Sequence, residues 1–364
     1  MTEIFLTIFF ISVLLFFLGT GIWVAISMIG VSSIGMMLFT SRPVGDAMAT
    51  TIWGASSSWT LTALPLFVWM GEILFRTKLS ENLFKGLAPW MQKLPGGLIH
   101  VNVVGCALFA AISGSSAATV ATVGKMSIPE LRKRKYPEKI LLGSLAGSGT
   151  LGLLIPPSII LIIYGVTVQE SIAKLFIAGI IPGIMIALIF MSYVIVWSLI
   201  NKKSMPKSLE NYSFIEKIKK SKQLVPVVLL IVAVIGSIYT GIATATEAAS
   251  LGVVGALILS YLQKSLTKET FRASLLGATK TSCMIAFILA GATFLSLAMG
   301  FTGLPRNLAI WIQGMELSPY VLIFVLMFFY IILGMFLDGI SAVVLTMAII
   351  EPMIRQAGFD MIWF

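Results

Sequence analysis

Two apolar stretches of this chain contain short runs of small polar residues that could bind an ion. The first run is Ser113-Gly114-Ser115-Ser116-Ala117, and the second is Asp338-Gly339-Ile340-Ser341-Ala342. Both runs offer hydroxyl or carboxylate oxygens, and glycine leaves backbone carbonyls accessible. Oxygen ligands of this kind suit a hard cation. The chemistry that these runs favour is therefore ion or ligand binding inside an apolar protein.

A third polar segment, residues 147–158, follows the first run and contains Gly149 and the pair Pro156-Pro157. The prolines lack backbone N–H groups and clash with the preceding helical turn, while glycine weakens the turns before them. A simple kink in a membrane helix would explain this pattern. We favour a broken helix that faces the first run, because exposed carbonyls and serine hydroxyls there would suit a monovalent cation.

Asp338 is the acidic residue with the most informative position, because an ionised carboxylate is costly at membrane depth. It could bind a cation, exchange a proton or act as a structural partner for a backbone amide. Glu247, by contrast, is expected to cap the helix that follows it, where a negative charge suits the helix dipole.

The sequence has no pattern typical of an enzyme. His100 is the only histidine and is expected at an interface, and Cys106 and Cys283 lie singly in apolar stretches. A Walker-type nucleotide loop is also missing from the sequence, so ATP does not power this chain directly. We expect neither catalysis nor an organic cofactor.

Composition predicts the elements that must position these residues. Apolar residues make up 58% of the 364 positions and charged residues 11%, which is far from the composition of soluble domains. The apolar runs are too long for the strands of a membrane barrel. The net charge of +10 is confined to loops, so nucleic-acid binding is not expected. The predicted fold is an all-α polytopic membrane protein, with apolar runs at 4–18, 21–40, 58–75, 96–130, 140–163, 172–200, 223–240, 246–263, 276–302 and 319–350.

Loop charges give this arrangement an orientation. The loops at 76–95, 125–139, 201–222 and 264–280 carry most of the 25 Lys and Arg residues, which predicts that they are cytoplasmic and that the N-terminus is periplasmic. The run at 96–130 has basic loops on both sides, so a single crossing would contradict this rule. We predict a re-entrant hairpin there, turning at Ser113–Ser116 and facing an internal site.

The second polar run predicts a second hairpin within 319–350. Each run is followed by an Xaa-Pro step, Ile128-Pro129 and Glu351-Pro352. The span at 276–302 leaves a cytoplasmic loop, so the second hairpin would enter from the outer face. The two halves are then inverted repeats, as in many transporters.

At these residues the sequence resembles the DctM family, the large permease subunits of tripartite ATP-independent periplasmic (TRAP) transporters. Ala245 departs from the family, which usually has proline there. The matching stretches are Met70–Leu74, Leu94–Leu98, Ser113–Thr119, Gly152–Ser158 and Thr246–Ala248.

The resemblance implies an elevator-type permease of the bacterial inner membrane. A sodium gradient would drive the import of an organic acid (a C4-dicarboxylate, sialate or a related carboxylate), with a small four-span subunit and a periplasmic binding protein as partners. It implies a first sodium site at Ser113, Gly114, Ser115, Ser116, Gly149, Pro156 and Pro157. It implies a second at Asp338, Gly339 and Ser341, and substrate contacts at Ser116, Thr119 and Ser341.

The predicted domains follow the repeats. Scaffold spans occupy 1–95 and, with the basic loop, 201–275; the transport domain occupies 96–200 and 276–364. A counterpart of the proline pair would fall beyond Phe364. We therefore expect a truncated product or another chain that completes the repeat, and impaired transport if nothing does.

Three alternatives remain at this point. The nearest is a stand-alone sodium/dicarboxylate symporter without a binding protein, which a neighbouring binding-protein gene would exclude. A membrane enzyme lacks a nucleophile in this sequence. A channel fits paired broken hairpins less well than alternating access does.

Overall fold

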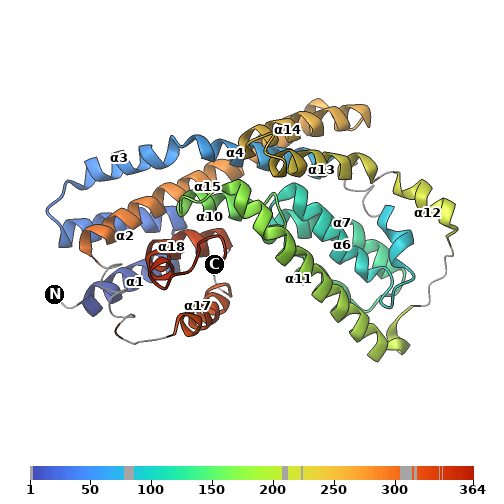
Figure 1. The fold of residues 1–364 in the computed structure, drawn as a ribbon, viewed down its shortest axis with the longest axis horizontal. Coiled ribbons are helices and arrows are strands. Elements are labelled where there is room, and N and C mark those ends of the chain that lie inside the picture. The colour runs from blue at the N-terminus through green and yellow to red at the C-terminus, as the bar shows by residue number, and fades with distance from the viewer. Residues whose placement is uncertain are drawn as a thin grey trace. The chain divides into compact units, whose positions relative to one another are not determined.

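The computed structural model describes residues 3–77, 86–206, 212–222, 224–303, 314, 318–335, 337 and 339–364, and within these ranges the regular elements are helices (Figure 1). The helices are α1 (Glu3–Gly19), α2 (Val24–Phe39), α3 (Val44–Ser56), α4 (Ala63–Arg76), α6 (Ile99–Ser113), α7 (Ser116–Lys133), α8 (Glu138–Gly149), α9 (Leu151–Leu154), α10 (Ile159–Thr167), α11 (Ile172–Ile200), α12 (Phe214–Ser221), α13 (Val225–Tyr239), α14 (Ala245–Leu262), α15 (Lys268–Thr302), α17 (Pro319–Leu333) and α18 (Gly339–Gln356).

Several of these helices suit a membrane. Four of them, α11, α14, α15 and α18, are each long and apolar enough to cross a bilayer, and three bent helix pairs raise the number to as many as seven among the described residues. The all-helical character predicted from composition is therefore confirmed, and these apolar helices are consistent with a polytopic membrane protein.

Near the N-terminus the helices differ from the predicted spans in two places. Helix α3 lies where no span was predicted, because Asp46 and its small polar neighbours interrupt the apolar run. The run at 58–75 begins with a short 3-10 turn at Trp59–Thr62 before α4 starts. Apolar run length finds long apolar helices, and it misses helices of mixed composition.

The described chain forms two compact units. One unit comprises Met1–Leu61, Ile163–Ser171 and Ser282–Phe364, and the other comprises Thr62–Ile162 and Ile172–Thr281. The predicted division into scaffold and transport domains is a functional one, and it stays a prediction.

The unit that contains Thr62–Ile162 holds the first hairpin. Helices α6, α7 and α8 pack around a core that includes Leu98, Leu131 and Leu141. The side chain of Asn102 on α6 is fully buried and donates to Ser144 Oγ on α8 at 3.0 Å. Because an unpaired buried amide is costly, this bond helps fix how α8 lies against the hairpin.

His100 lies at the hairpin entrance, as expected, and is buried within the protein. Its side chain is completely buried, and Nε2 lies 2.7 Å from the carbonyl oxygen of Pro95. A loop carbonyl close in sequence therefore provides the polar partner of this buried ring. Its depth relative to the membrane interface stays a prediction.

In the other unit, α17 and α18 form a second helical hairpin. Leu322 and Leu326 of α17 pack with Met347 and Ile350 of α18 in one apolar cluster. The hydroxyls of Tyr330 and Thr346 lie 2.6 Å apart, so a hydrogen bond joins the two arms. A hairpin within 319–350 is therefore present as predicted.

Candidate ion-binding site

The tip of the first hairpin is a tight, glycine-dependent turn. Helix α6 ends at Ser113, and Gly114 adopts the left-handed conformation, with φ +58°. Ser115 is extended, and its hydroxyl accepts a hydrogen bond from the Ala118 N–H at the start of α7. The left-handed region favours glycine, which has no Cβ. The predicted turn at Ser113–Ser116 is therefore confirmed.

Hydroxyl groups tie the turn together from within. Thr119 Oγ1 donates to the carbonyl oxygen of Ser115 at 2.7 Å and lies 2.9 Å from Ser113 Oγ. Thr119 is completely buried, so its hydroxyl serves the turn itself. Ser116 is only half-buried, and among the described residues its hydroxyl makes no hydrogen bond. Of the predicted tip residues, Ser116 offers the most available side-chain oxygen.

The predicted helix break follows α8. Helix α8 ends at Gly149, α9 covers only Leu151–Leu154, and α10 continues after a bend of 41°. Proline at 156 and 157 cannot donate to the carbonyls of Gly152 and Leu153. The Ser158 hydroxyl donates instead to the carbonyl of Leu153 at 2.5 Å. The broken helix, rather than a simple kink, is the arrangement observed.

The hairpin tip and the broken helix lie in direct contact. The Ile159 N–H donates to the carbonyl oxygen of Gly114 at 3.3 Å. A Cβ placed on Gly152 would lie 2.9 Å from the carbonyl oxygen of Ser115 and 2.9 Å from the Ser116 nitrogen. Gly149 similarly lies against Val120. The structure therefore brings the tip against Gly149 and Pro157, while Pro156 packs against Gly179. The roles of these residues as ligands stay predictions.

Ser148 is a buried serine that neighbours this contact in the chain, and it was not among the predicted site residues. Its side chain is completely buried, and Oγ has no hydrogen-bond partner among the described residues. It lies next to Gly149, at the end of α8. Serine at that position looks like any small membrane residue, and only burial without a partner reveals it.

The oxygen atoms around the tip fit a monovalent cation better than a transition metal. Within the described ranges, no group of three or more His, Cys, Asp or Glu side chains could hold a metal ion. The oxygen atoms that could coordinate a cation there belong to serine hydroxyls and to backbone carbonyls, such as the Gly152 carbonyl that Pro156 leaves without a helical N–H partner. Neutral oxygen donors of this kind suit a hard cation of low charge.

The residues predicted for the second sodium site are placed only in part. Asp338 lies outside the described residues. Gly339 begins α18, and Ser341 in its first turn is 1% exposed. Ser341 therefore faces the interior, and the ligand set around it stays a prediction.

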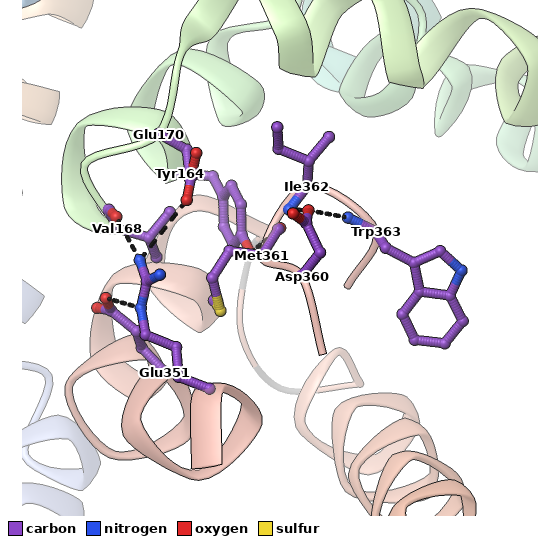
Figure 2. A network of polar contacts seen from close by, with 9 residues as sticks. Tyr164, Val168, Glu170, Glu351, Asp360, Met361, Ile362 and Trp363 are labelled. Atoms are coloured by element: carbon purple, nitrogen blue, oxygen red, sulfur yellow. Dashed lines mark hydrogen bonds and ion pairs between the residues drawn. The ribbon is translucent and has the colours of Figure 1, made fainter. Parts of the chain in front are cut away.

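A polar network surrounds the other end of α18 (Figure 2). Arg355 donates to Glu351 at 2.9 Å and to the carbonyl oxygen of Val168 at 3.0 Å, and Nη2 lies 3.7 Å from Glu170. The Tyr164 hydroxyl donates to the carbonyl of Met361 at 2.6 Å. This guanidinium is therefore engaged by protein groups.

Comparison with known proteins matches nearly the whole chain to one family. The family model described as "Tripartite ATP-independent periplasmic transporter, DctM component" matches residues 11–364. The C4-dicarboxylate TRAP transporter large permease protein DctM of Pseudomonas aeruginosa is 31% identical over 333 residues, which cover 91% of this chain and 77% of the relative.

Two further relatives carry other substrate names at the same identity. The sialic acid TRAP transporter large permease protein SiaM of Vibrio cholerae is 31% identical over 350 residues, 95% of this chain and 81% of the relative. The 2,3-diketo-L-gulonate TRAP transporter large permease protein YiaN of Escherichia coli is 31% identical over 325 residues, 87% and 74% of the two chains.

Proposed function

This chain belongs to the DctM family of TRAP transporter large permeases. We propose that it imports an organic acid and that a sodium gradient drives this import. It is a membrane permease and not an enzyme, in line with the names of its relatives. The family works with a small membrane subunit and a periplasmic binding protein. This chain would use the same two kinds of partner in the inner membrane, with its N-terminus on the periplasmic side.

The contact between the first hairpin tip and the broken helix carries the sodium proposal. Two interrupted backbones meet there, with the available hydroxyl of Ser116 at the tip and the buried, unpaired hydroxyl of Ser148 one position before Gly149. In a membrane such interruptions are tolerated where protein buries them or where they line a water-filled cavity. A sodium ion would supply the positive partner that these neutral oxygens lack. The second site would be completed by Asp338, Gly339 and Ser341.

Movement of the hairpins explains how such sites could alternate between the two faces. Each unit contains one helical hairpin, and loop charges predict that they enter the membrane from opposite sides. We take them as inverted repeats of an elevator-type transport domain. Sodium bound at the tips would stabilise the state that accepts the substrate.

The substrate class follows from the relatives' names. The names of these three relatives give a C4-dicarboxylate, sialic acid and 2,3-diketo-L-gulonate as their substrates, and all three are organic acids. Their near-equal identity to this chain selects none of the three. Ser116, Thr119 and Ser341 are the proposed substrate contacts; of these Ser116 has an available hydroxyl, whereas Thr119 would have to release the Ser115 carbonyl to reach a substrate. An uptake screen of organic acids would choose among substrates.

Uptake into proteoliposomes tests the proposal. The permease is reconstituted with its small subunit and binding protein, and labelled substrate is followed under an inward sodium gradient or a proton gradient alone. We expect uptake only with sodium. Equal uptake with the proton gradient would refute sodium coupling, and uptake without the binding protein would favour the stand-alone symporter.

A matched pair of variants locates the ion. Ser116→Ala should raise the sodium concentration for half-maximal uptake, because it removes an available ligand. Ser33→Ala is the control, since the Ser33 hydroxyl only donates to the carbonyl of Ile29 within α2 at 2.8 Å. An unchanged sodium dependence in Ser116→Ala would remove this hydroxyl from the site.

A further inference from the structure

Helix α12 is a short, well-capped helix in the most basic loop of the chain. Ser213 precedes it, and the Ser213 N–H donates to the Glu216 carboxylate at 2.8 Å in a capping box. A capping box fixes where a helix begins. The segment is therefore a defined helix, although its eight residues are too few to be stable alone in water.

One face of α12 is seated on the protein. Trp90 Nε1 donates to the hydroxyl of Ser221 at 2.7 Å, and the Lys217 ammonium lies 5.3 Å from the centre of the Trp90 ring. Lys217 is 8% exposed, and the Phe214 ring makes an edge contact with Trp90. These contacts orient the helix about its axis.

The adjacent face of α12 is apolar and open. Phe214 is 66% exposed, Ile215 is 76% exposed and Ile218 is 45% exposed. Residues at this spacing lie on one side of a helix. Lys219 borders this face on one side, and Lys220 lies on the far side of the helix with its ammonium 3.9 Å from the centre of the Tyr212 ring. The loop on either side of the helix adds Lys222, Lys202 and Lys203.

The next helix places this face at the membrane surface. Helix α13 begins at Val225, four positions after Ser221, and the two helices are bent by 58° (Figure 1). The 15 residues of α13 span about 22 Å, which is less than the roughly 30 Å of a hydrocarbon core. The lysines of α12 are too costly to bury in hydrocarbon. A basic helix that directly precedes an apolar one is thus expected where the core meets the headgroups.

We propose that α12 is an interfacial anchor that binds anionic phospholipid. The apolar face of Phe214, Ile215 and Ile218 would enter the acyl-chain boundary, and the bordering lysines would contact the headgroups. The charge pattern supports this occupant over a protein, because basic amphipathic helices bind anionic surfaces. The loop is predicted to be cytoplasmic, and anionic headgroups attract basic segments beside a span.

Depth measurement on the full chain tests this proposal. Ile215→Cys, in a background with Cys106→Ala and Cys283→Ser, carries a nitroxide label in vesicles of phosphatidylcholine with or without phosphatidylglycerol. Accessibility to oxygen and to a water-soluble nickel chelate reports the depth. We expect the label to be immersed with phosphatidylglycerol and to shift toward water in phosphatidylcholine alone. A label at Val232→Cys, on the exposed side of α13, should stay immersed in both.

Charge variants separate headgroup binding from simple apolar burial. Lys219→Gln, Lys220→Gln and Lys222→Gln together should shift the Ile215 label toward water in phosphatidylglycerol vesicles. The three Lys→Arg changes keep the charge and should restore immersion, which also shows that the helix still folds.

Three outcomes would overturn the proposal. A label open to the nickel chelate in both lipids means that no bilayer covers the face. A label closed to both reagents means that a protein, such as a second copy or the small subunit, covers it. Equal immersion in both lipids removes the anionic headgroup. None of these readouts depends on transport, so they stand apart from the sodium proposal.

Discussion

The two helical hairpins are held in place at opposite ends. The tip of the first hairpin lies against the broken helix, with the Gly114 carbonyl accepting from Ile159 and Gly152 touching the Ser115 backbone. The second hairpin is bound at its other end, where Arg355 of α18 contacts Glu170 and Val168. One contact is backbone against backbone, and the other is a charged side-chain network.

This difference has a consequence for how each hairpin tolerates change. A close backbone approach depends on the absence of a Cβ and leaves no side chain that could adjust. An ion-pair network with partly exposed groups can rearrange and is screened by solvent. The first tip should therefore be sensitive to one added methyl group, and the end of α18 should lose little when one charge is removed.

Gly114→Ala is the change with the largest expected effect. The new Cβ would lie 3.0 Å from the Ile159 nitrogen and from the Pro157 carbonyl oxygen, at a residue with φ +58°. We expect a loss of about 2–4 kcal/mol in the free energy of unfolding, from backbone strain and overpacking together. Equilibrium unfolding of the detergent-solubilised protein measures it.

Gly241→Ala separates backbone strain from overpacking in the expected loss of unfolding free energy. Gly241 has φ +72°, and a Cβ there would meet nothing within 4 Å. It should lose only the strain, about 1–2 kcal/mol. If the two variants lose the same stability, then contact with the broken helix contributes nothing at the first tip.

Gly152→Ala should have the next largest effect. Its Cβ would press on the Ser115 and Ser116 backbone from the side of the broken helix, and overpacking of this kind costs about 1–3 kcal/mol. Gly143→Ala is the matched control, because Gly143 is exposed on α8 with nothing within 4 Å. The control should gain up to about 1 kcal/mol from helix propensity. Equal thermal stability of the two variants in detergent would contradict the close contact.

Much of this arrangement could be predicted from the sequence, because a membrane makes the relevant signals strong. Loop charges on both sides of 96–130 required a hairpin, and the glycine and serines at its centre fixed the turn. The proline pair removes two backbone donors wherever it stands, so the break after α8 was also predictable. These features follow from local chemistry.

What the sequence did not reveal depends on burial and on distant partners. Ser148 became a candidate only because its buried hydroxyl lacks a hydrogen-bond partner among the described residues. The polar partner of His100 is a loop carbonyl, which no sequence pattern predicts. The contacts of Arg355 with Val168 and Glu170 join segments far apart in the chain. The spacing of side chains along the sequence does not predict contacts between such distant segments.

Arg355→Gln tests the charged end of the comparison. The Arg355 side chain is 47% exposed, so solvent screening limits its contribution, and we expect a loss of about 1 kcal/mol that falls at high salt. Arg132→Gln is the control, since the Arg132–Glu138 pair is 56% and 55% exposed and should be worth about 0.5 kcal/mol or less. Unfolding at low and high salt measures both. A loss as large as that of Gly114→Ala would erase the distinction between the two ends.

Tyr330→Phe should have the smallest effect, because it removes a single hydrogen bond between the arms of the second hairpin. The Thr346 hydroxyl that loses Tyr330 still donates to the carbonyl of Ala342 at 2.7 Å, so no buried group is left unpaired. We expect a loss of about 0.5–1 kcal/mol. Tyr320→Phe is the control, since Tyr320 is 75% exposed and its hydroxyl has no hydrogen bond to the described residues. A larger loss of unfolding free energy in Tyr330→Phe than in Gly152→Ala would contradict this order. The second hairpin would then depend more on the bond between its arms than the first hairpin depends on its tip.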